Sequence, residues 1–185
     1  MCGTKYGVPM IMGLKQSSGK IAWALSGTIG YNTNFTGIQC TPSLTGSGAV
    51  LVATFSGDTD GSDNWEYVKS IDTEATITNY PAFNYAATYG TTNSLTGEYQ
   101  DGWYLPSIAE LAEVYKNKEK LNKVLIALGT DKADVIKAAD YWSSSQDATH
   151  FKLVWLVGFY DGNIDTKHTY GKSSSDYVLV VRICD

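Results

Sequence analysis

Short apolar runs near both ends of the chain, with helical spacing confined to the middle, limit the fold more than any other feature of this sequence. Residues 19–25 and 49–55 are apolar runs bounded by turn residues, which predicts short buried strands. Two more strands are predicted at residues 153–159 and 177–183, and an Asp161-Gly162 turn follows the first of them. No internal repeat or linker separates these segments. We therefore predict one α+β domain over residues 1–185.

Three helices are predicted between the strand-like ends. A helix over residues 81–89 has proline in its first position and glycine just after its end. Ser107 and Glu110 have the spacing of a capping box, which predicts a helix that begins at Ser107. Apolar residues continue at helical spacing over residues 121–128, where a glycine ends the pattern. We interpret these short helices as scaffold.

The length and charge of the chain exclude several classes of protein. Its 185 residues fit one domain, which is large enough to bury a core without disulfides or metals. The formal net charge of −5 argues against binding to a nucleic-acid backbone, because that partner requires a basic surface. No apolar run approaches the roughly 20 residues that span a bilayer.

The three cysteines, Cys2, Cys40 and Cys184, lie far apart, and none has the spacing of a zinc site. We interpret them as isolated thiols, with one disulfide between two of them left open as an alternative. The start Met1-Cys2 lacks the apolar segment of a signal peptide. It matches the mature start of a bacterial lipoprotein, in which the first cysteine carries the lipid.

Residues 58–63 carry three carboxylates beside a glycine, as calcium-binding loops do. The glycine comes too early, however, and no glutamate stands at the twelfth position of the loop. We therefore predict a solvated turn in this segment and no metal site in the protein.

No arrangement of catalytic residues is recognisable in the sequence. Both histidines, His150 and His168, fall near the C-terminal end, and no nucleophile elbow or phosphate-binding glycine loop occurs. The serines at residues 143–145 lack the lysine of a Ser-x-x-Lys pair. Because a triad needs a nucleophile, a base and an orienting acid, we predict that the protein is not an enzyme and uses no cofactor.

The segment over residues 147–177 mixes polar and aromatic residues around a few apolar ones. If Trp155 and Phe159 face the core, strand alternation leaves Leu156 and Tyr160 exposed. Tyrosine mixed with serine, glycine and asparagine is typical of antibody-type binding surfaces, because tyrosine adds contact area at low entropic cost. An ordinary loop region in a tyrosine-rich protein is the alternative.

Four ordered motifs cover the part of the chain from residue 82 to residue 185. They are residues 102–111 (GWYLPSIAEL), residues 141–145 (YWSSS), residues 155–162 (WLVGFYDG) and Val181-Arg182. Together they resemble the signature of a bacterial domain family, the Lcl C-terminal or DUF1566 type, whose first motif reads Trp-x-Leu-Pro-[Ser/Thr]-x-x-Glu-Leu. The resemblance implies a C-type-lectin-like fold of the formylglycine-generating-enzyme type, in which helices pack on a twisted, mostly antiparallel β core.

Within that family, the likeness is greatest to the variable proteins of diversity-generating retroelements, of the kind known from Treponema. In those systems a reverse transcriptase mutates the adenines of a template, and the copy replaces the C-terminal coding region. The resemblance implies that Lys152, Trp155, Lys167 and Lys172 are fixed scaffold, because mutated Asn codons do not give Lys or Trp. The predicted ligand-binding residues are those that such codons reach: Asp147, Thr149, His150, Leu156, Tyr160, Asp161, Asn163, Asp165, His168 and Tyr170.

The resemblance implies a surface-displayed protein whose diversified C-terminal face recognises varied macromolecular ligands. The partner would be a protein or glycan on another cell or surface, with Leu156, Tyr160, His168 and Tyr170 as anchors. We expect a monomer that binds no nucleic acid. It would be extracellular or at the cell surface, as an outer-membrane lipoprotein that meets the membrane only through a lipid on Cys2. A fixed glycan- or protein-binding adhesin of the Lcl type, without diversification, is the alternative.

Other relatives of this fold fit the sequence less well. The formylglycine-generating enzyme uses coupled cysteines, whereas Cys184 has no second cysteine nearby. Calcium-dependent lectins use Glu-Pro-Asn and Trp-Asn-Asp motifs, and neither occurs. Lcl-type relatives are associated with sulfated polysaccharides, which would require Lys152, Lys167 and Lys172 to gather on the surface of this acidic chain.

Overall fold

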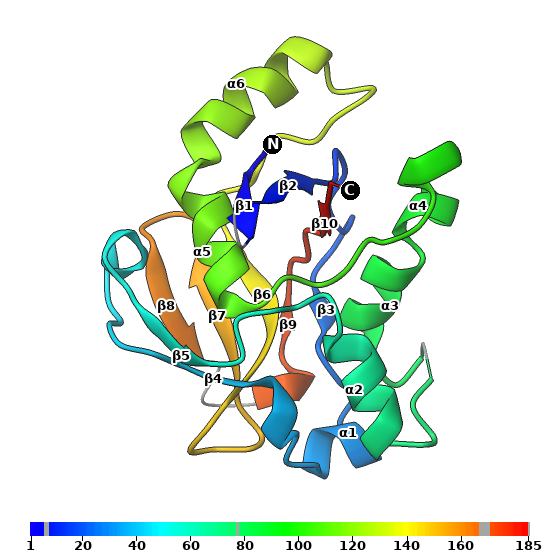
Figure 1. Cartoon of the computed structure of the whole chain (residues 1–185), viewed down its shortest axis with the longest axis vertical. Coiled ribbons are helices and arrows are strands. Elements are labelled where there is room, and N and C mark those ends of the chain that lie inside the picture. The colour runs from blue at the N-terminus through cyan, green and yellow to red at the C-terminus, as the bar shows by residue number, and fades with distance from the viewer. Residues whose placement is uncertain (6–7, 77, 167–170, 185) are drawn as a thin grey trace.

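The computed structural model of the chain describes residues 1–5, 8–76, 78–166 and 171–184 (Figure 1). Its central element is a five-stranded sheet in the order β5-β4-β6-β7-β8. Within this sheet β4 and β6 are parallel, and the other neighbours are antiparallel. The strands are β4 (Gln39–Pro42), β5 (Phe55–Gly57), β6 (Asp140–Asp147), β7 (Val154–Gly158) and β8 (Asn163–Thr166).

Two smaller sheets join segments from the two ends of the chain. β2 (Val8–Met12) lies between β1 (Gly3–Lys5) and β10 (Val181–Ile183) and is antiparallel to both. β3 (Ile21–Ala22) pairs with β9 (Ser175–Asp176). The N-terminal and C-terminal segments therefore lie side by side (Figure 1).

Helices cover both faces of the central sheet (Figure 1). The α-helices of the described residues are α1 (Ile29–Asn32), α2 (Asn64–Ile71), α3 (Pro81–Ala87), α4 (Tyr89–Thr92), α5 (Ile108–Lys116) and α6 (Lys118–Leu128). Short 3-10 turns are η1 (Thr36–Ile38), η2 (Ala49–Leu51), η3 (Gly97–Tyr99) and η4 (Gly171–Ser173). No helix in the part of the chain that the structure describes has the length and apolar character needed to cross a membrane. The α+β class predicted from the sequence is confirmed.

Helix α5 begins as the capping box predicts. Ser107 Oγ accepts a hydrogen bond from Glu110 N (3.2 Å), and Glu110 Oε2 accepts one from Ser107 N (2.8 Å). Glu110 is buried, and its carboxylate also accepts from Gly61 N (3.0 Å) and the Tyr104 hydroxyl (2.9 Å). One carboxylate therefore joins the start of α5 to two other segments. The helix predicted over residues 121–128 is also present, as part of α6.

The prediction of a strand over residues 49–55 is wrong. Gly48, at φ 71°, turns the chain into η2, and only Phe55 belongs to a strand. Val50 is buried in this turn, whereas Leu51 and Val52 are exposed. A short apolar run satisfies a strand or a turn equally well, so periodicity alone does not distinguish them.

Other predicted segments differ in length. The helix predicted over residues 81–89 is two helices, α3 and α4, and the second passes through Gly90. A Cβ at Gly90 would lie 1.8 Å from Gln100 O, so the glycine permits a close approach rather than ending a helix. Of the strands predicted at residues 19–25 and 177–183, only the short β3 and β10 form.

The hydrophobic core consists of two clusters, one on each face of the central sheet. The cluster toward α5 includes Tyr141 and Val157, and the cluster toward α2 and α3 includes Trp142 and Leu156. Successive residues of β6 and β7 therefore point into different cores, as strand geometry requires. A sheet covered on both faces was not predicted from the sequence.

Strand β6 brings polar side chains into this interior, because seven of its eight residues are buried. Ser144 Oγ accepts a hydrogen bond from Asn64 Nδ2 (2.8 Å), and Ser145 Oγ accepts one from Ile108 N (2.9 Å). These serines satisfy donors of α2 and α5 that would otherwise be buried without a partner. The YWSSS segment thus acts in packing, in agreement with a scaffold role.

Replacing Glu110 with alanine is expected to lower the free energy of unfolding by about 3 kcal/mol or more, because it leaves buried donors without an acceptor. Glu113→Ala, on the same helix, is the matched control. The Glu113 carboxylate is partly exposed and pairs with Lys116 (2.7 Å), so its loss should cost less than about 1 kcal/mol. Chemical denaturation of both variants measures the difference, and equal losses would contradict the role given to Glu110.

Candidate functional site

The residues predicted to bind ligand lie at both ends of β7 and within the sheet, not in one patch. They fall into three groups: Asp147, Thr149 and His150 before β7, Leu156 and Asp165 within β7 and β8, and Tyr160, Asp161 and Asn163 at the β7–β8 turn. His168 and Tyr170 lie outside the described residues. Because a strand rises about 3.3 Å per residue, the first and last Cα atoms of β7 are roughly 13 Å apart.

The expectation that Leu156 faces solvent is wrong. Its side chain is 3% exposed and packs in the same cluster as Trp142 and Val154. Both faces of β7 are covered, so alternation along the strand separates two cores rather than a core from solvent. Leu156 therefore holds the sheet to the helices and does not reach a ligand in this structure.

At the β7–β8 turn, polar groups hold a neighbouring loop. Asn163 Oδ1 accepts a hydrogen bond from Gly46 N (2.8 Å), and Asp161 O accepts one from Gly48 N (2.6 Å). Asp161 Oδ1 also accepts from Asn163 N (2.9 Å). Tyr160 is exposed. This end of the strand therefore presents an exposed ring, while Asp161 and Asn163 shape the turn beneath it.

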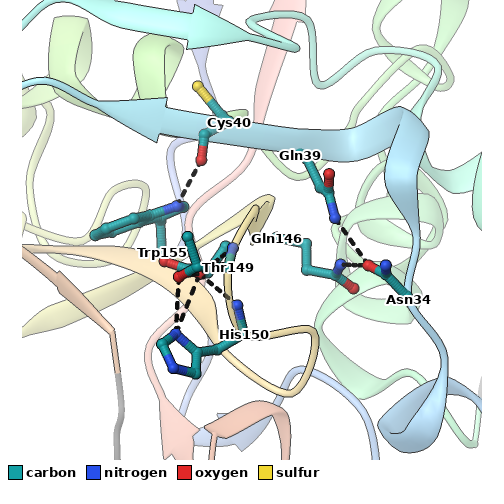
Figure 2. Close-up of polar contacts among 8 residues, drawn as sticks. Asn34, Gln39, Cys40, Gln146, Thr149, His150 and Trp155 are labelled. Carbon is teal, nitrogen blue, oxygen red and sulfur yellow. Dashed lines mark hydrogen bonds and ion pairs between the residues drawn. The ribbon is translucent and has the colours of Figure 1, made fainter.

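At the other end of β7, the Asp147 carboxylate fixes the loop that follows β6. Asp147 is 7% exposed, and its Oδ1 accepts from Thr149 N (2.7 Å), Thr149 Oγ1 (2.6 Å) and His150 N (2.7 Å). An aspartate that binds the backbone just ahead of it in this way stabilises a tight turn. Thr149 and His150 are thus exposed side chains on a fixed backbone (Figure 2).

The His150 imidazole contacts the same hydroxyl, since Nδ1 lies 2.8 Å from Thr149 Oγ1 (Figure 2). The hydroxyl has one proton and donates it to Asp147, so the hydrogen in this contact belongs to His150 Nδ1. Thr149 is therefore not a nucleophile activated by His150. The arrangement provides hydrogen-bonding groups at a surface.

Asn34, in the segment between α1 and β4, belongs to a second polar network near this loop (Figure 2). Its Oδ1 accepts from Gln39 Nε2 (2.8 Å) and from Gln146 Nε2 (2.6 Å). The buried Gln146 also accepts, through Oε1, from Phe35 N (3.1 Å) and Lys172 Nζ (2.9 Å). The parallel pairing of β4 with β6 places Gln39 opposite Gln146 and so makes this network possible.

Lys172 is a fully buried amine beneath the loop. Its Nζ donates to Thr33 O (2.8 Å) and Gly30 O (3.1 Å) at the end of α1. It also lies 4.8 Å from the ring centre of Phe35 and 5.1 Å from that of Trp23. Burial lowers the pKa of Lys172 to about 7, because desolvation disfavours the charged form.

Lys172 is buried and so cannot contribute to a basic surface of three lysines, and Lys167 lies outside the described residues. Lys152 is exposed, and its Nζ lies 5.1 Å from the ring centre of Tyr31 and 5.8 Å from that of Phe151. These distances are those of cation–π contacts, which hold the lysine beside the two rings.

We use the name loop face for Asn34, Thr149, His150, Phe151 and Lys152, all of which are exposed. Sequence reasoning missed Asn34, because the Gln146 contact that brings it here spans 112 positions of the chain. It also missed Phe151, whose exposure a local apolar pattern does not reveal. Exposed rings, hydroxyls and charged groups on a fixed loop are suited to recognition.

All three cysteines are free thiols, and none is one of the residues of the loop face. Burial raises the pKa of Cys2 to about 12 and that of Cys40 to about 11, so these thiols are unreactive. Cys2 Sγ donates to Met10 O (3.3 Å) in the core, and a lipid on this sulfur would have to replace that contact.

Residues 58–63 form the turn that the sequence predicts. Asp58 Oδ1 accepts from Asp60 N (3.0 Å), and Asp60 Oδ1 accepts from Ser62 N (2.8 Å) and Ser62 Oγ (2.6 Å). Aspartate oxygens bonded to the backbone two residues ahead are typical of such turns. Among the described residues, no group of three or more His, Cys, Asp and Glu side chains could hold a metal ion.

The sequence profile of the Lcl C-terminal domain matches residues 54–182, which is more than half of the chain. The chain therefore belongs to the Lcl C-terminal domain family, as its four motifs indicate.

A fimbrial protein from Bacteroides ovatus ATCC 8483, known from a crystal structure, has a similar fold. The two chains superpose with a TM-score of 0.57 and 22% sequence identity, over 93% of this chain and 35% of that chain. This chain thus spans about a third of the fimbrial protein, and at this identity the likeness concerns the fold alone. The comparison with curated protein sequences found no significant match.

The buried amine of Lys172 predicts a pH dependence of stability. Its pKa is about 7 in the folded protein and 10.5 in the reference state, so the unfolded chain binds more protons between these values. The free energy of unfolding should therefore rise with pH from about 7 to about 9. Lys172→Met should flatten this rise, whereas Lys152→Met, at an exposed lysine, should keep it. Denaturation at several pH values measures the slopes, and a slope unchanged by Lys172→Met would contradict the prediction.

Proposed function

We propose that this protein is a ligand-binding module of the adhesin type, at the cell surface or extracellular, and that the loop face contacts the ligand. Membership of the Lcl C-terminal domain family supports this proposal, as does the fold shared with a fimbrial protein. The proposed ligand is a macromolecule, a protein or glycan on another cell or surface. The net charge of −5 makes a nucleic acid the poorer partner.

The fixed presentation of Thr149 and His150 by Asp147 is the observation that carries the proposal. Binding orders mobile loops at a cost in entropy, and a loop held in advance avoids much of that cost. Residues 149–152 also combine a hydroxyl, an imidazole, an aromatic ring and an ammonium group. Such a surface supports recognition by shape and by hydrogen bonds, with no covalent step.

Catalysis is less well supported by the same groups. The Thr149 hydroxyl is engaged by Asp147, and the His150 side chain is 71% exposed, so no activated nucleophile lies in a water-excluded site here. We therefore propose a monomeric binding protein that is not an enzyme and uses no cofactor.

We also propose that the fold is C-type-lectin-like. The packing of helices on both faces of a mostly antiparallel sheet supports this assignment. So does the pairing of β2 with β10, which brings both ends of the chain together.

Diversification by a retroelement is a finer proposal, for which the exposed positions Thr149, His150, Tyr160 and Asp165 are the natural targets. Changes at such positions are usually nearly neutral for stability, so a fixed scaffold tolerates them. A fixed adhesin is the second candidate. It is favoured by Asp147 and Asn163, because replacing either would remove hydrogen bonds that hold a loop.

Alanine at His150, Phe151 and Lys152 together is expected to weaken binding to an array of glycans and purified cell-surface proteins at least tenfold. The melting temperature should change little, because all three side chains are exposed. Asp147→Ala should also weaken binding, since the loop then loses its fixed shape. Ile126→Ala, at an exposed position of α6 outside every predicted ligand-binding residue, is the control and should bind normally. Binding unaffected by the triple variant would contradict the role of the loop face.

Amplicon sequencing of the 3′ coding region in a population of the source cells separates the two candidates. Diversification predicts substitutions at the codons of exposed residues such as Thr149, His150 and Tyr160, with Trp142 and Phe159 invariant. A uniform sequence in an actively growing population would favour the fixed adhesin.

A further inference from the structure

A groove lined by aromatic rings lies at the opposite end of the molecule from the loop face. Two hollows of about 700 Å³ and 640 Å³ lie between α4 and the segments that follow β2 and α6. Both are lined by Lys15 and Asn93, so they adjoin each other, and we name the two together the aromatic groove. In Figure 1, α4 and β2 lie in the upper half of the molecule, whereas the loop between β6 and β7 is at the bottom. Hollows of this size are typical of ligand sites.

Four rings line the groove, and three of them form a row of contacts. The ring centroids of Tyr89 and Trp103 are 4.7 Å apart, and those of Tyr85 and Tyr89 are 6.0 Å apart. Trp103 Nε1 donates a hydrogen bond to the backbone oxygen of Tyr99 (2.7 Å), which holds Tyr99, the fourth aromatic residue, next to Trp103. Tyr99 is 47% exposed and Trp103 is half-buried, so both are accessible from the groove.

Local structure fixes the groove walls. Helix α4 ends at Thr92, Ser94 beyond it has a φ of 53°, and Leu95 N donates to Gly90 O (2.8 Å), which turns the chain back along the groove. On the other wall, Lys15 N donates to the Tyr89 hydroxyl (2.9 Å). The hollow is therefore a feature of packed and hydrogen-bonded segments.

The polar groups around the groove are mostly uncharged, and the charges nearly balance. The uncharged donors and acceptors are Gln16, Ser17, Ser18, Thr92, Asn93, Ser94, Thr96 and Thr130. The charged residues are Lys15, Lys132 and Lys137 against Asp131 and Asp134, and Lys15 Nζ lies 3.4 Å from Asp134 Oδ1. A ligand that fits this groove therefore needs hydrogen-bonding groups and no net charge.

This chemistry favours one ligand class over two others. An extended peptide usually adds to a free sheet edge, but β2 already has β1 and β10 on its two sides. An anionic ligand is better served by a strongly basic site, whereas here two aspartates face the three lysines and Lys15 pairs with Asp134. A pyranose ring has C–H faces that pack on aromatic rings and a rim of hydroxyls that bond to amides and hydroxyls.

We propose that the aromatic groove binds a neutral oligosaccharide, with Tyr99 and Trp103 packing against the sugar rings and the uncharged rim bonding to their hydroxyls. The site shares no residue with the loop face and does not depend on the function proposed for it.

The test uses the full chain and an array of neutral hexasaccharides of glucose, mannose, galactose, xylose and N-acetylglucosamine. At least one hexasaccharide should bind, and Tyr99→Ala should weaken that binding at least tenfold with an unchanged melting temperature. Trp103→Phe should abolish the change in tryptophan fluorescence that the sugar causes. Leu51→Ala, at a side chain 60% exposed in η2 and outside both surfaces, is the control and should leave sugar binding unchanged. Phe151→Ala tests whether the sugar occupies the loop face instead.

Three results would overturn the proposal. The first is that no hexasaccharide binds the wild-type chain at millimolar concentration. The second is that Tyr99→Ala binds as well as wild type, and the third is that Phe151→Ala weakens binding as much as Tyr99→Ala does. Because Phe151 belongs to the loop face, that last outcome would assign the sugar to the surface of the proposed function instead.

Discussion

Burial of strand β6 on both faces is the constraint on which the rest of the structure depends. The strand carries five consecutive polar residues at positions 143–147, in an interior where an unpaired polar group costs about 1–3 kcal/mol. Ser144 and Ser145 bond to α2 and to the start of α5, on which the two cores are built. Gln146 and Asp147 bond to the α1–β4 segment and to the β6–β7 loop. One strand therefore orders elements on every side of it.

The loop face follows from the same constraint. Asp147 is the last residue of β6, where the sheet meets solvent, so its buried carboxylate can hold exposed residues from beneath. The side-chain amide of Gln146 holds the exposed Asn34 in the same way, and Lys172 donates a hydrogen bond to that amide. The buried residues that hold the loop face in place are thus distinct from the exposed residues that form it. Such a division allows a binding surface to change while its support stays constant.

The loop face and the aromatic groove differ in how they are built. The loop face is a row of consecutive side chains on a short turn, suited to directional contacts with a large partner. The groove is assembled from α3, α4 and the segments after β2 and α6, and its rings provide contact area for a chain-like ligand. The two share no residue, and the elements that carry them lie at opposite ends of the molecule in Figure 1.

Local patterns in the sequence were sufficient to predict the α+β class, the family and the start of α5. The start of α5 was predictable because a capping box involves only residues within four positions of one another. It was not sufficient for residues 49–55 or for the face of β7, since a short apolar run suits a strand, a turn, or a strand with two buried faces. Leu156 is buried because helices from an earlier part of the chain cover its side of the sheet. Asn34 joins the site because β4 pairs with β6, more than 100 residues later. The sequence by itself thus determined the kind of protein, whereas tertiary packing alone decided which candidate residues reach solvent, because exposure depends on what distant segments cover.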